Sequence, residues 1–390
     1  MTQPVFSRRT PQRAESNRLA EARARRGEPA VDLTVSNPTR CGLNTPEELL
    51  AGLADPRGLT YHADPRGPLP ARRAIADDYR RWNAAVDPDS MVLAASTSEA
   101  YSLLFKLLCD PGDTVLVPRP SYPLFEQLTR LDAVTALPFE LRADDDWRLP
   151  TETLAAAPGR TRAVILVHPN NPTGHHVHPE DAAAVTALCR QRRWALIVDE
   201  VFLPFTLDGG PGAEHSFAGE DRCLSFTLGG LSKSIGLPQL KLAWIIPGGP
   251  AATVAAAGER LDYITDAYLS VSTPAALAVP ELLRRADGVQ RAITERCDSN
   301  LQALRRAAAS LASATVLPVG GGWSAILRLP ALMDDEELAL QLLEERGVAV
   351  QPGFFYDLPF DASLVLSLLT PNDDWRRGLA AIVETVTGLV

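Results

Sequence analysis

The strongest constraint on the fold of this chain is a repeated rhythm of short apolar runs, most of them followed by a loop and a helical stretch. The runs lie at 114–118, 163–167, 195–198, 223–228 and 242–246. Apolar runs that are rich in β-branched residues and alternate with helices are typical of a mainly parallel sheet buried on both faces. We therefore expect an α/β fold whose central sheet is sandwiched by helices. In such folds, ligands bind beyond the carboxyl ends of the strands.

A change of pattern near residue 280 indicates a second unit. A long helical stretch from 281 to 311 precedes short apolar runs, a further helical segment and a final helix. We predict a smaller α+β domain formed by residues 31–55 and 281–390, a large domain at 56–280 and an N-terminal arm at 1–30. The arm is rich in Arg, carries Glu and has no apolar segment, so we do not expect a secretory signal. It is either a solvated surface helix or a contact arm on a neighbouring subunit.

The composition disfavours several classes of protein. The net charge of −10 argues against nucleic acid or an anionic membrane as the main partner. No apolar run approaches the roughly 18 residues of a membrane span. The five cysteines are scattered, without a CxxC pair. We therefore expect reduced thiols and a cytoplasmic protein, with neither a disulfide framework nor a zinc site.

Lysine is rare in this chain, and its rarity draws attention to Lys233. Of the 38 basic residues only three are lysine, at positions 106, 233 and 241. An amine can lose its proton and form a Schiff base with a carbonyl compound such as pyridoxal phosphate, whereas a guanidinium cannot. Lys233 follows the apolar run 223–228 and is therefore a candidate nucleophile. An ordinary surface charge is the alternative.

Asp199 and Asn171 follow two other apolar runs. A carboxylate at the end of a buried strand is costly unless it is paired, and the protonated ring nitrogen of pyridoxal phosphate would be a suitable partner. An N-cap or a structural ion pair would also explain Asp199. Asn171 lies in the turn HPNNPTG at 168–174, where its amide can donate to a phenolate oxygen of the cofactor. A turn without a ligand is the plain alternative.

Three further features are compatible with a phosphorylated aromatic ligand. Ser96, Thr97 and Ser98 open an apolar helix with Glu99 in a capping-box pattern, and a helix N-terminus with free N–H groups can bind phosphate. Tyr122, in PRPSYP at 118–123, can lie flat on an aromatic ring, and Lys241 can act as a point charge on the phosphate. A simple cap, core packing and an exposed lysine are the respective alternatives.

Together these stretches resemble the class I and II aminotransferases, the fold-type I enzymes that use pyridoxal phosphate. The resemblance runs from about residue 33 to the C-terminus, and the matching segments occur in the order of the family. They are YHADPRG (61–67), STSEA (96–100), PRPSYP (118–123), HPNNPTG (168–174), VDEVF (198–202), LSKSIGLPQLK (231–241) and VAVQPGFF (348–355).

The resemblance implies a role for each matching residue. Lys233 is implied as the Schiff-base lysine and proton-transferring base, Asp199 as the partner of the ring nitrogen, Asn171 as the donor to the ring oxygen and Tyr122 as the stacking aromatic. Tyr61 is implied to reach the phosphate of a neighbouring subunit, so a homodimer with shared sites is expected. The cofactor-binding set is then Tyr61, Ser96, Thr97, Ser98, Tyr122, Asn171, Asp199, Ser232, Lys233 and Lys241. By family position, Phe354, Trp323 and Tyr268 line the pocket.

Four departures from the family pattern concern the phosphate, the ring oxygen and the substrate. Gly230 stands where a phosphate-binding Ser is usual, with Ser232 as a possible substitute, and Lys241 replaces an Arg. Phe202 replaces a Tyr that donates to the ring oxygen. Val365, in LVLSLL at 364–369, takes the place of the Arg that clamps the substrate carboxylate. Losing such a bidentate pair should weaken the binding of an ordinary amino acid.

The family pattern therefore does not identify the residues that bind the substrate carboxylate in this chain. The candidates are Ser36, Arg40 and Asn171. The histidines of HHVH at 175–178 follow a turn and have no fourth ligand at suitable spacing, so we expect surface histidines and no metal site.

The resemblance implies a transferase that moves an amino group between an amino acid and a 2-oxo acid through a Lys233 Schiff base. The missing carboxylate clamp keeps open a pyridoxal-phosphate-dependent lyase or cyclase that acts on a specialised amino acid, since function depends on the site and not on the fold. A non-catalytic regulator would need a DNA-binding domain before the core, and the polar arm is too short for one.

Overall fold

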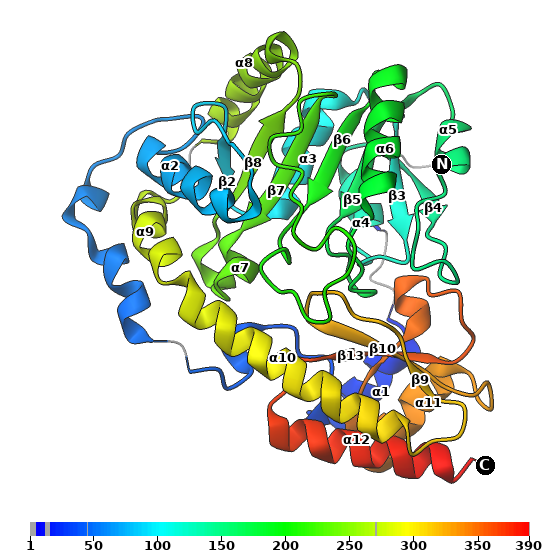
Figure 1. Cartoon of the computed structure of the whole chain (residues 1–390). Coiled ribbons are helices and arrows are strands. Elements are labelled where there is room, and N and C mark those ends of the chain that lie inside the picture. Colours follow the sequence, from blue (N-terminus) through cyan, green and yellow to red (C-terminus); the bar gives the residue numbers. More distant parts are fainter. Residues whose placement is uncertain (1–4, 12–15, 45, 270, 390) are drawn as a thin grey trace.

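A seven-stranded sheet lies at the centre of the large unit in the computed structural model, which describes residues 5–11, 16–44, 46–269 and 271–389 (Figure 1). The strand order is β2-β8-β7-β6-β5-β3-β4. Strands β3 to β7 run parallel, whereas β8 is antiparallel to both of its neighbours. The α/β fold expected from the apolar runs is confirmed. The bounds are β2 (Val92–Ala94), β3 (Thr114–Arg119), β4 (Thr135–Glu140), β5 (Thr161–Val167), β6 (Ala195–Asp199), β7 (Ser225–Gly230) and β8 (Ala243–Gly248).

Helices cover both faces of this sheet, which explains why its inner strands are apolar at successive positions. Ile165 and Ile197 pack into one core with α3 and α8, and Val164 and Leu196 pack into the opposite core with α6. Successive residues of a strand point to opposite faces, so both sets must be apolar. The helices of this unit are α2 (Leu69–Asp78), α3 (Thr97–Leu108), α4 (Phe125–Leu131), α5 (Thr151–Ala155), α6 (Pro179–Arg192), α7 (Leu231–Ser234), α8 (Ala251–Tyr268) and α9 (Thr273–Arg284).

The smaller unit is built on a four-stranded antiparallel sheet in the order β12-β13-β10-β9. The helical stretch expected from 281 to 311 is interrupted: α9 ends at Arg284, and a separate helix α10 follows. The bounds are α10 (Ala286–Ala308), β9 (Thr315–Val316), β10 (Ser324–Arg328), α11 (Asp335–Gln341), η6 (Leu342–Arg346), β11 (Val348–Ala349), β12 (Gln351–Pro352), η7 (Gly353–Tyr356), β13 (Ser363–Ser367) and α12 (Asn372–Thr387).

The N-terminal segments extend over both units. Strand β1 (Val31–Asp32) pairs in parallel with β11, and η2 (Glu47–Ala54) packs on α9 of the large unit. η1 (Pro38–Arg40) lies between β1 and η2. η3 (Pro56–Leu59) precedes α2, and η4 (Tyr79–Trp82) follows it. The domain boundaries drawn from the sequence stay a prediction.

The described part of the N-terminal arm lies against its own chain. In α1 (Arg18–Arg26), Ala22 packs with Leu340 and Leu343, and Arg18 forms an ion pair with Glu337 at 2.7 Å. Residues 1–4 and 12–15 of the predicted arm lie outside the described residues.

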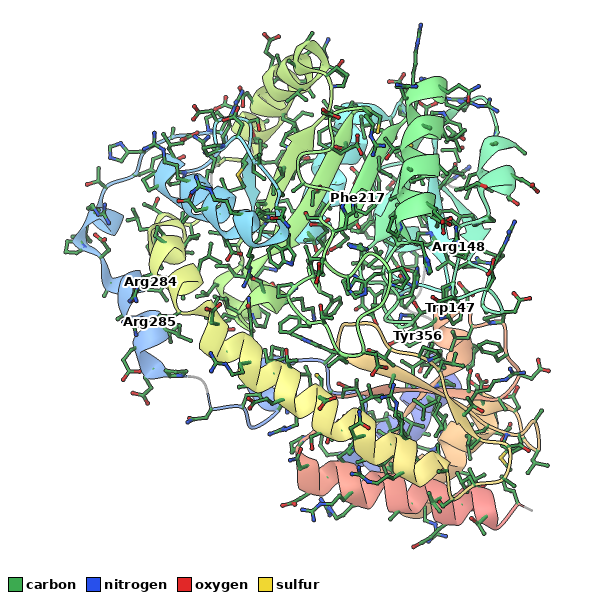
Figure 2. The ribbon with its side chains drawn as sticks, in the orientation of Figure 1. Trp147, Arg148, Phe217, Arg284, Arg285 and Tyr356 are labelled. Atoms are coloured by element: carbon green, nitrogen blue, oxygen red, sulfur yellow. The ribbon has the colours of Figure 1, made fainter. Side chains whose placement is uncertain are left out.

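The two units meet over a shared apolar core. Val365 of β13 and Ile326 of β10 pack with Leu116 and Phe139 of the large sheet. Trp147 and Tyr356 belong to the same core, and Figure 2 shows both where the two units meet. Within the described residues, no helix is both long and apolar enough to cross a membrane.

Candidate active site

The candidate site lies at the carboxyl ends of the parallel strands, where β6 ends at Asp199. The Asp199 side chain is buried; its Oδ1 accepts the backbone N–H of Val201 at 3.1 Å, and its Oδ2 accepts the hydroxyl of Tyr101 at 3.2 Å. Burial raises the pKa of Asp199 to about 6, against the opposing effects of these bonds and of Lys233. Within the described chain, no Arg or Lys forms an ion pair with this carboxylate. The site therefore contains a buried acid that interacts with the Lys233 charge but forms no direct ion pair among the described residues.

Lys233 lies in α7, the short turn that directly follows β7. Two bonds fix this turn: the backbone N–H of Leu231 donates to the carbonyl of Leu242 at 3.0 Å, and the Ser234 hydroxyl donates to the carbonyl of Gly230 at 3.0 Å. Burial lowers the pKa of Lys233, while the charge of Asp199 opposes the shift. Desolvation thus increases the fraction of neutral amine near neutral pH, which is the form that attacks a carbonyl carbon.

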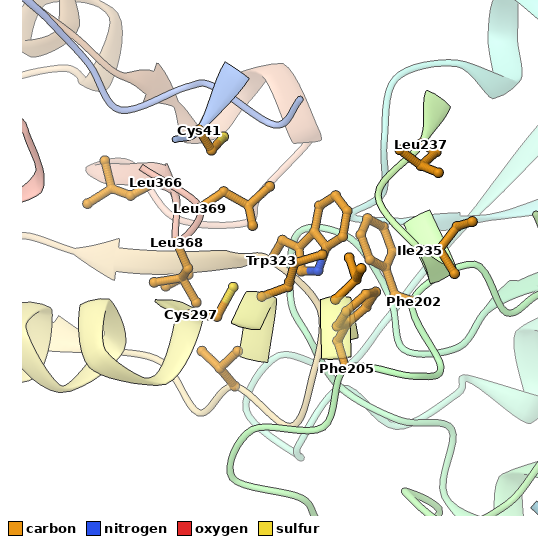
Figure 3. Packing of buried hydrophobic residues seen from close by; sticks show 14 of the residues in the cluster. Cys41, Phe202, Phe205, Ile235, Leu237, Cys297, Trp323, Leu366, Leu368 and Leu369 are labelled. Atoms are coloured by element: carbon orange, nitrogen blue, oxygen red, sulfur yellow. The ribbon is translucent and has the colours of Figure 1, made fainter. Parts of the chain in front are cut away.

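Two aromatic rings border the Lys233 amine. Its Nζ lies 5.6 Å from the ring centroid of Phe202 and 5.0 Å from that of Trp323. The two rings meet edge to face at 5.3 Å, and Phe205 packs on Trp323 at 5.0 Å. Figure 3 shows Trp323 between these two phenylalanines and the side chains of Cys41 and Leu369. The amine is therefore held against an apolar wall formed by both units.

Asn171 connects the large unit to β10. Its Oδ1 accepts the hydroxyl of Ser324 at 3.3 Å, and this bond orients the amide so that the Nδ2 group remains available as a donor. The neighbouring Asn170 fixes the turn, because its Nδ2 donates to the Pro120 carbonyl and to the Thr173 hydroxyl, both at 3.0 Å.

The N-terminus of α3 has the cap that the sequence predicts. The Ser96 hydroxyl oxygen accepts the backbone N–H of Glu99 at 3.1 Å, and the Glu99 carboxylate accepts the N–H of Ala95 at 2.5 Å. The backbone N–H groups of Thr97 and Ser98 have no protein partner within the described residues. Such free N–H groups at a helix start are suited to an anion.

Three of the residues predicted to bind the cofactor have no side-chain contact with Lys233 within the described residues. Tyr122 is 51% exposed, and its neighbour Ser121 donates its N–H to the Tyr356 carbonyl at 3.3 Å. Lys241 is exposed in a left-handed backbone conformation at φ +50°, and Ser232 is half-buried. Their contacts with a cofactor stay predictions.

The candidate residues of the N-terminal segments are exposed. Tyr61 is 62% exposed in the connection that leads to α2, and Ser36 and Arg40 are also exposed in this single chain. Exposure is compatible with a contact made by a second subunit or by a ligand, but it assigns neither, so these roles also stay predictions.

Val365 lies inside the apolar core between the two units. It is 1% exposed in the middle of β13, where it pairs with Ile326 and Gln351. A buried aliphatic side chain cannot bind a carboxylate, so the substrate carboxylate needs other donors in this chain.

The expectation of surface histidines at 175–178 is wrong for two of the three. His175 and His176 are buried, whereas His178 is half-buried beside Asp146 at 3.0 Å. The reason lies in a distant loop: an added side-chain atom at Gly320 would come within 2.9 Å of His176 Nδ1. No group of His, Cys, Asp or Glu in the described part of the chain has the arrangement of a metal site.

Two partners of the site were missed in the sequence. Tyr101 holds the Asp199 carboxylate, and Ser324 holds Asn171. Tyr101 lies on the buried side of α3, where helical periodicity indicates only a core position. Ser324 follows Trp323 in the second unit, so its contact depends on how the units pack.

The donors and acceptors of this region fit pyridoxal phosphate. The buried carboxylate of Asp199, which has no direct ion pair among the described residues, suits a protonated ring nitrogen. The Lys233 amine, whose pKa is lowered by burial, suits an aldehyde. The free N–H groups at the start of α3 suit a phosphate. All three lie at the carboxyl edge of the same sheet, although they are contributed by three separate segments.

Comparisons with known proteins agree with this geometry. Residues 29–382 match the family described as aminotransferase class I and II. The arginine–pyruvate transaminase AruH of Pseudomonas aeruginosa is 29% identical over 347 residues, which cover 86% of this chain and 84% of that protein. The glutamate–pyruvate aminotransferase AlaA of Escherichia coli is 25% identical over 397 residues, which cover 97% and 95% of the two chains.

Solved structures show the same fold. An alanine aminotransferase from Pyrococcus furiosus superposes with a TM-score of 0.85 at 20% identity and covers 95% of both chains. An aspartate aminotransferase from Thermotoga maritima gives a TM-score of 0.82 at 24% identity and covers 98% of this chain and 100% of its own. None of these similarities supports the lyase or cyclase alternative.

Proposed function

This chain belongs to the class I and II aminotransferase family and is an aminotransferase; on that premise, we propose that Lys233 forms the Schiff base through which it moves an amino group between an amino acid and a 2-oxo acid. One observation carries the proposal: the Lys233 amine is desolvated at the carboxyl edge of the sheet, beside the buried acid Asp199.

Each residue around Lys233 has a separate task in this proposal. When bound, pyridoxal phosphate supplies an aldehyde that condenses with amines and a protonated ring that draws electron density from the substrate Cα. Asp199 keeps the ring nitrogen protonated, and Tyr101 holds that carboxylate in place. Asn171 presents its Nδ2 group to the ring oxygen, because Ser324 already occupies its Oδ1. Lys233 Nζ, as a free amine, would take the proton from the substrate Cα and deliver it to the cofactor carbon that carried the aldehyde.

The phosphate is assigned to the start of α3. Ser96, Thr97 and Ser98 offer backbone N–H groups and hydroxyls there, with Ser232 and Lys241 adding a hydroxyl and a charge. Tyr122 is proposed to lie on the ring. Tyr61 of the partner subunit is proposed to complete the phosphate site, which makes the active form a homodimer.

The substrate assignment is the least complete part of the proposal. With Val365 in the core, the carboxylate must find its donors elsewhere, and Ser36, Arg40 and Asn171 are the proposed candidates. Two of the relatives described above are named for pyruvate, so pyruvate is the first acceptor to test. Because the five cysteines are scattered along the sequence without a CxxC pair, we also propose a reducing, cytoplasmic location.

The role of Lys233 can be tested by covalent trapping. We expect borohydride reduction of the protein with pyridoxal phosphate to label the peptide that contains Lys233, since the chain has only three lysines. Lys233→Ala should purify without attached cofactor and lose amino-group transfer by at least about 1000-fold. Lys106→Ala is the matched control and should keep both properties. Labelling at Lys106 or Lys241 would overturn the assignment.

A further inference from the structure

The indole N–H of Trp323 is a buried donor without a partner. Trp323 is 3% exposed, and its Nε1 has no hydrogen-bond acceptor within the described chain. Two other buried indoles are satisfied: Trp244 donates to the Tyr79 hydroxyl at 3.2 Å, and Trp375 donates to the Asn300 carbonyl at 2.9 Å. Buried donors are rarely left unpaired, so an orphan indole N–H next to a ligand site calls for an acceptor, and a ligand can supply one.

The position of Trp323 connects this donor to the reacting amine. The ring centroid lies 5.0 Å from Lys233 Nζ. The next residue, Ser324, binds the Asn171 amide at 3.3 Å. Trp323 therefore neighbours the reacting amine in space and the partner of Asn171 in sequence.

The surrounding wall contains few other donors. Phe202 and Phe205 pack on Trp323 at 5.3 and 5.0 Å and offer only carbon. Val365 is aliphatic and buried. In such an apolar environment a single neutral N–H donor gains importance, because a charged oxygen without a donor would be strongly disfavoured.

We propose that Trp323 is a ligand-contacting residue whose indole N–H donates a hydrogen bond to an anionic oxygen of the molecules that react at Lys233. This inference rests on the proposed function. The oxygen has two possible sources with the same chemistry, the ring oxygen of pyridoxal phosphate and the carboxylate of the amino acid, and the experiment distinguishes them.

The test compares Trp323→Phe, which keeps an aromatic ring but removes the N–H, with Trp375→Phe, which removes a buried indole N–H from α12. Both variants are loaded with pyridoxal phosphate. In the first arm, the visible absorbance of the bound cofactor is titrated with pH. If the ring oxygen is the acceptor, loss of the donor leaves more negative charge on that oxygen, and the midpoint in Trp323→Phe should rise by about one pH unit.

The second arm measures the binding of two amines that lack a Cα proton. 2-Methylalanine carries a carboxylate, and tert-butylamine carries a methyl group in its place. If the substrate carboxylate is the acceptor, Trp323→Phe should lose about tenfold in affinity for 2-methylalanine and almost none for tert-butylamine. Trp375→Phe should match the wild type in both arms. If the wild type binds 2-methylalanine no more tightly than tert-butylamine, the substrate carboxylate is not the acceptor. The pH titration of the first arm then decides whether the ring oxygen is the acceptor.

A rescue separates a lost donor from a packing defect. Phe202→Tyr places a hydroxyl on the ring that contacts Trp323. In the Trp323→Phe background, it should restore at least half of a shifted titration midpoint. If Trp323→Phe equals the wild type in both arms, the inference is wrong, although labelled Lys233 would still support the proposed function.

Discussion

Asp199 illustrates how a single residue can oppose folding and support binding. Burial raises its pKa from 3.8 to about 6 in the protein without ligand. Between these values the folded state binds the proton more tightly than the unfolded state, so the stability contributed by this group is lost as pH rises from about 4 to 6. At neutral pH the ionised form destabilises the unliganded protein by about 3 kcal/mol. A cationic ligand nitrogen would remove this penalty.

Replacing Asp199 by Asn should therefore have opposite effects on stability and on binding. The amide keeps an acceptor for the N–H of Val201 but carries no charge. We expect the unliganded protein to gain up to about 3 kcal/mol at pH 7.5, and the affinity for pyridoxal phosphate to fall at least about tenfold. Urea unfolding and an absorbance titration measure the two quantities.

A buried carboxylate remote from the site provides the control for Asp199→Asn. Asp113 pairs with Arg162 at 2.7 Å and with Arg160 at 3.1 Å at the opposite end of β3, and these bonds lower its pKa to about 2. Asp113→Asn should lower stability at pH 7.5 and leave cofactor affinity unchanged. Equal losses of affinity in both variants would show that Asp199 has no specific contact with the cofactor.

At the scale of elements, the turn between β5 and α6 contains several histidines that are neutral in the folded protein. Burial lowers the pKa of His175 to about 3 and of His176 to about 4. His168 accepts the backbone N–H of Val177 at 2.9 Å, and burial also holds its pKa well below the ordinary value. The unfolded chain binds protons on these rings below about pH 6.5, whereas the folded turn does not. Stability should therefore fall as pH falls from about 6.5 to 4.

The substitution His176→Gln measures the contribution of one of these rings to the pH dependence of stability, since glutamine does not titrate. Both ring nitrogens of His176 lack partners within the described residues, so the substitution should remove the acid sensitivity of this position without breaking a bond. We expect the loss of stability between pH 7.5 and 5 to shrink by about 2 kcal/mol, measured by urea unfolding of the cofactor-free protein. His62→Gln, at an exposed position, is the control for exchanging a histidine for glutamine. An unchanged slope in His176→Gln would contradict a neutral buried ring.

Strand β6 and helix α3 show which features of the fold the local sequence determines. The run 195–198 predicts β6 and the position of Asp199 at its end, because apolar residues on both faces require a buried strand. Ser96 and Glu99 predict the start of α3, because a cap is a contact between near neighbours. The α/β fold and the post-strand positions of Asp199 and Lys233 follow from such patterns.

Contacts between distant segments could not be predicted in this way. The burial of His176 depends on the Gly320 loop, the Tyr101 bond to Asp199 joins residues 98 positions apart, and the Ser324 bond to Asn171 joins residues 153 positions apart. Each of them is set by tertiary packing, which no local periodicity encodes.

At the scale of the whole molecule, apolar side chains remain exposed on two segments that touch. Leu59 and Tyr61 lie before α2 and are 92% and 62% exposed, and Leu269 follows α8 and is 71% exposed. Gly58 of η3 packs against Pro274 at the start of α9, which brings the two segments together. Figure 1 shows the chain around η2 and η3 as an outer edge of the large unit beside α9. Exposed apolar residues on adjoining segments favour a protein interface.

The proposed homodimer predicts that two defective subunits restore each other. Lys233→Ala lacks the amine, and Tyr61→Ala lacks the residue that is proposed to reach the partner's phosphate. Their heterodimer contains one intact site, made of Lys233 from one chain and Tyr61 from the other. Random pairing of equal amounts should therefore restore about a quarter of the wild-type sites, counted as borohydride-trapped cofactor at limiting pyridoxal phosphate. Light scattering should give twice the mass of the chain. If the dimer forms but mixing gives only the average of the two separate variants, each subunit carries a complete phosphate site, and Tyr61 acts within its own chain or not at all.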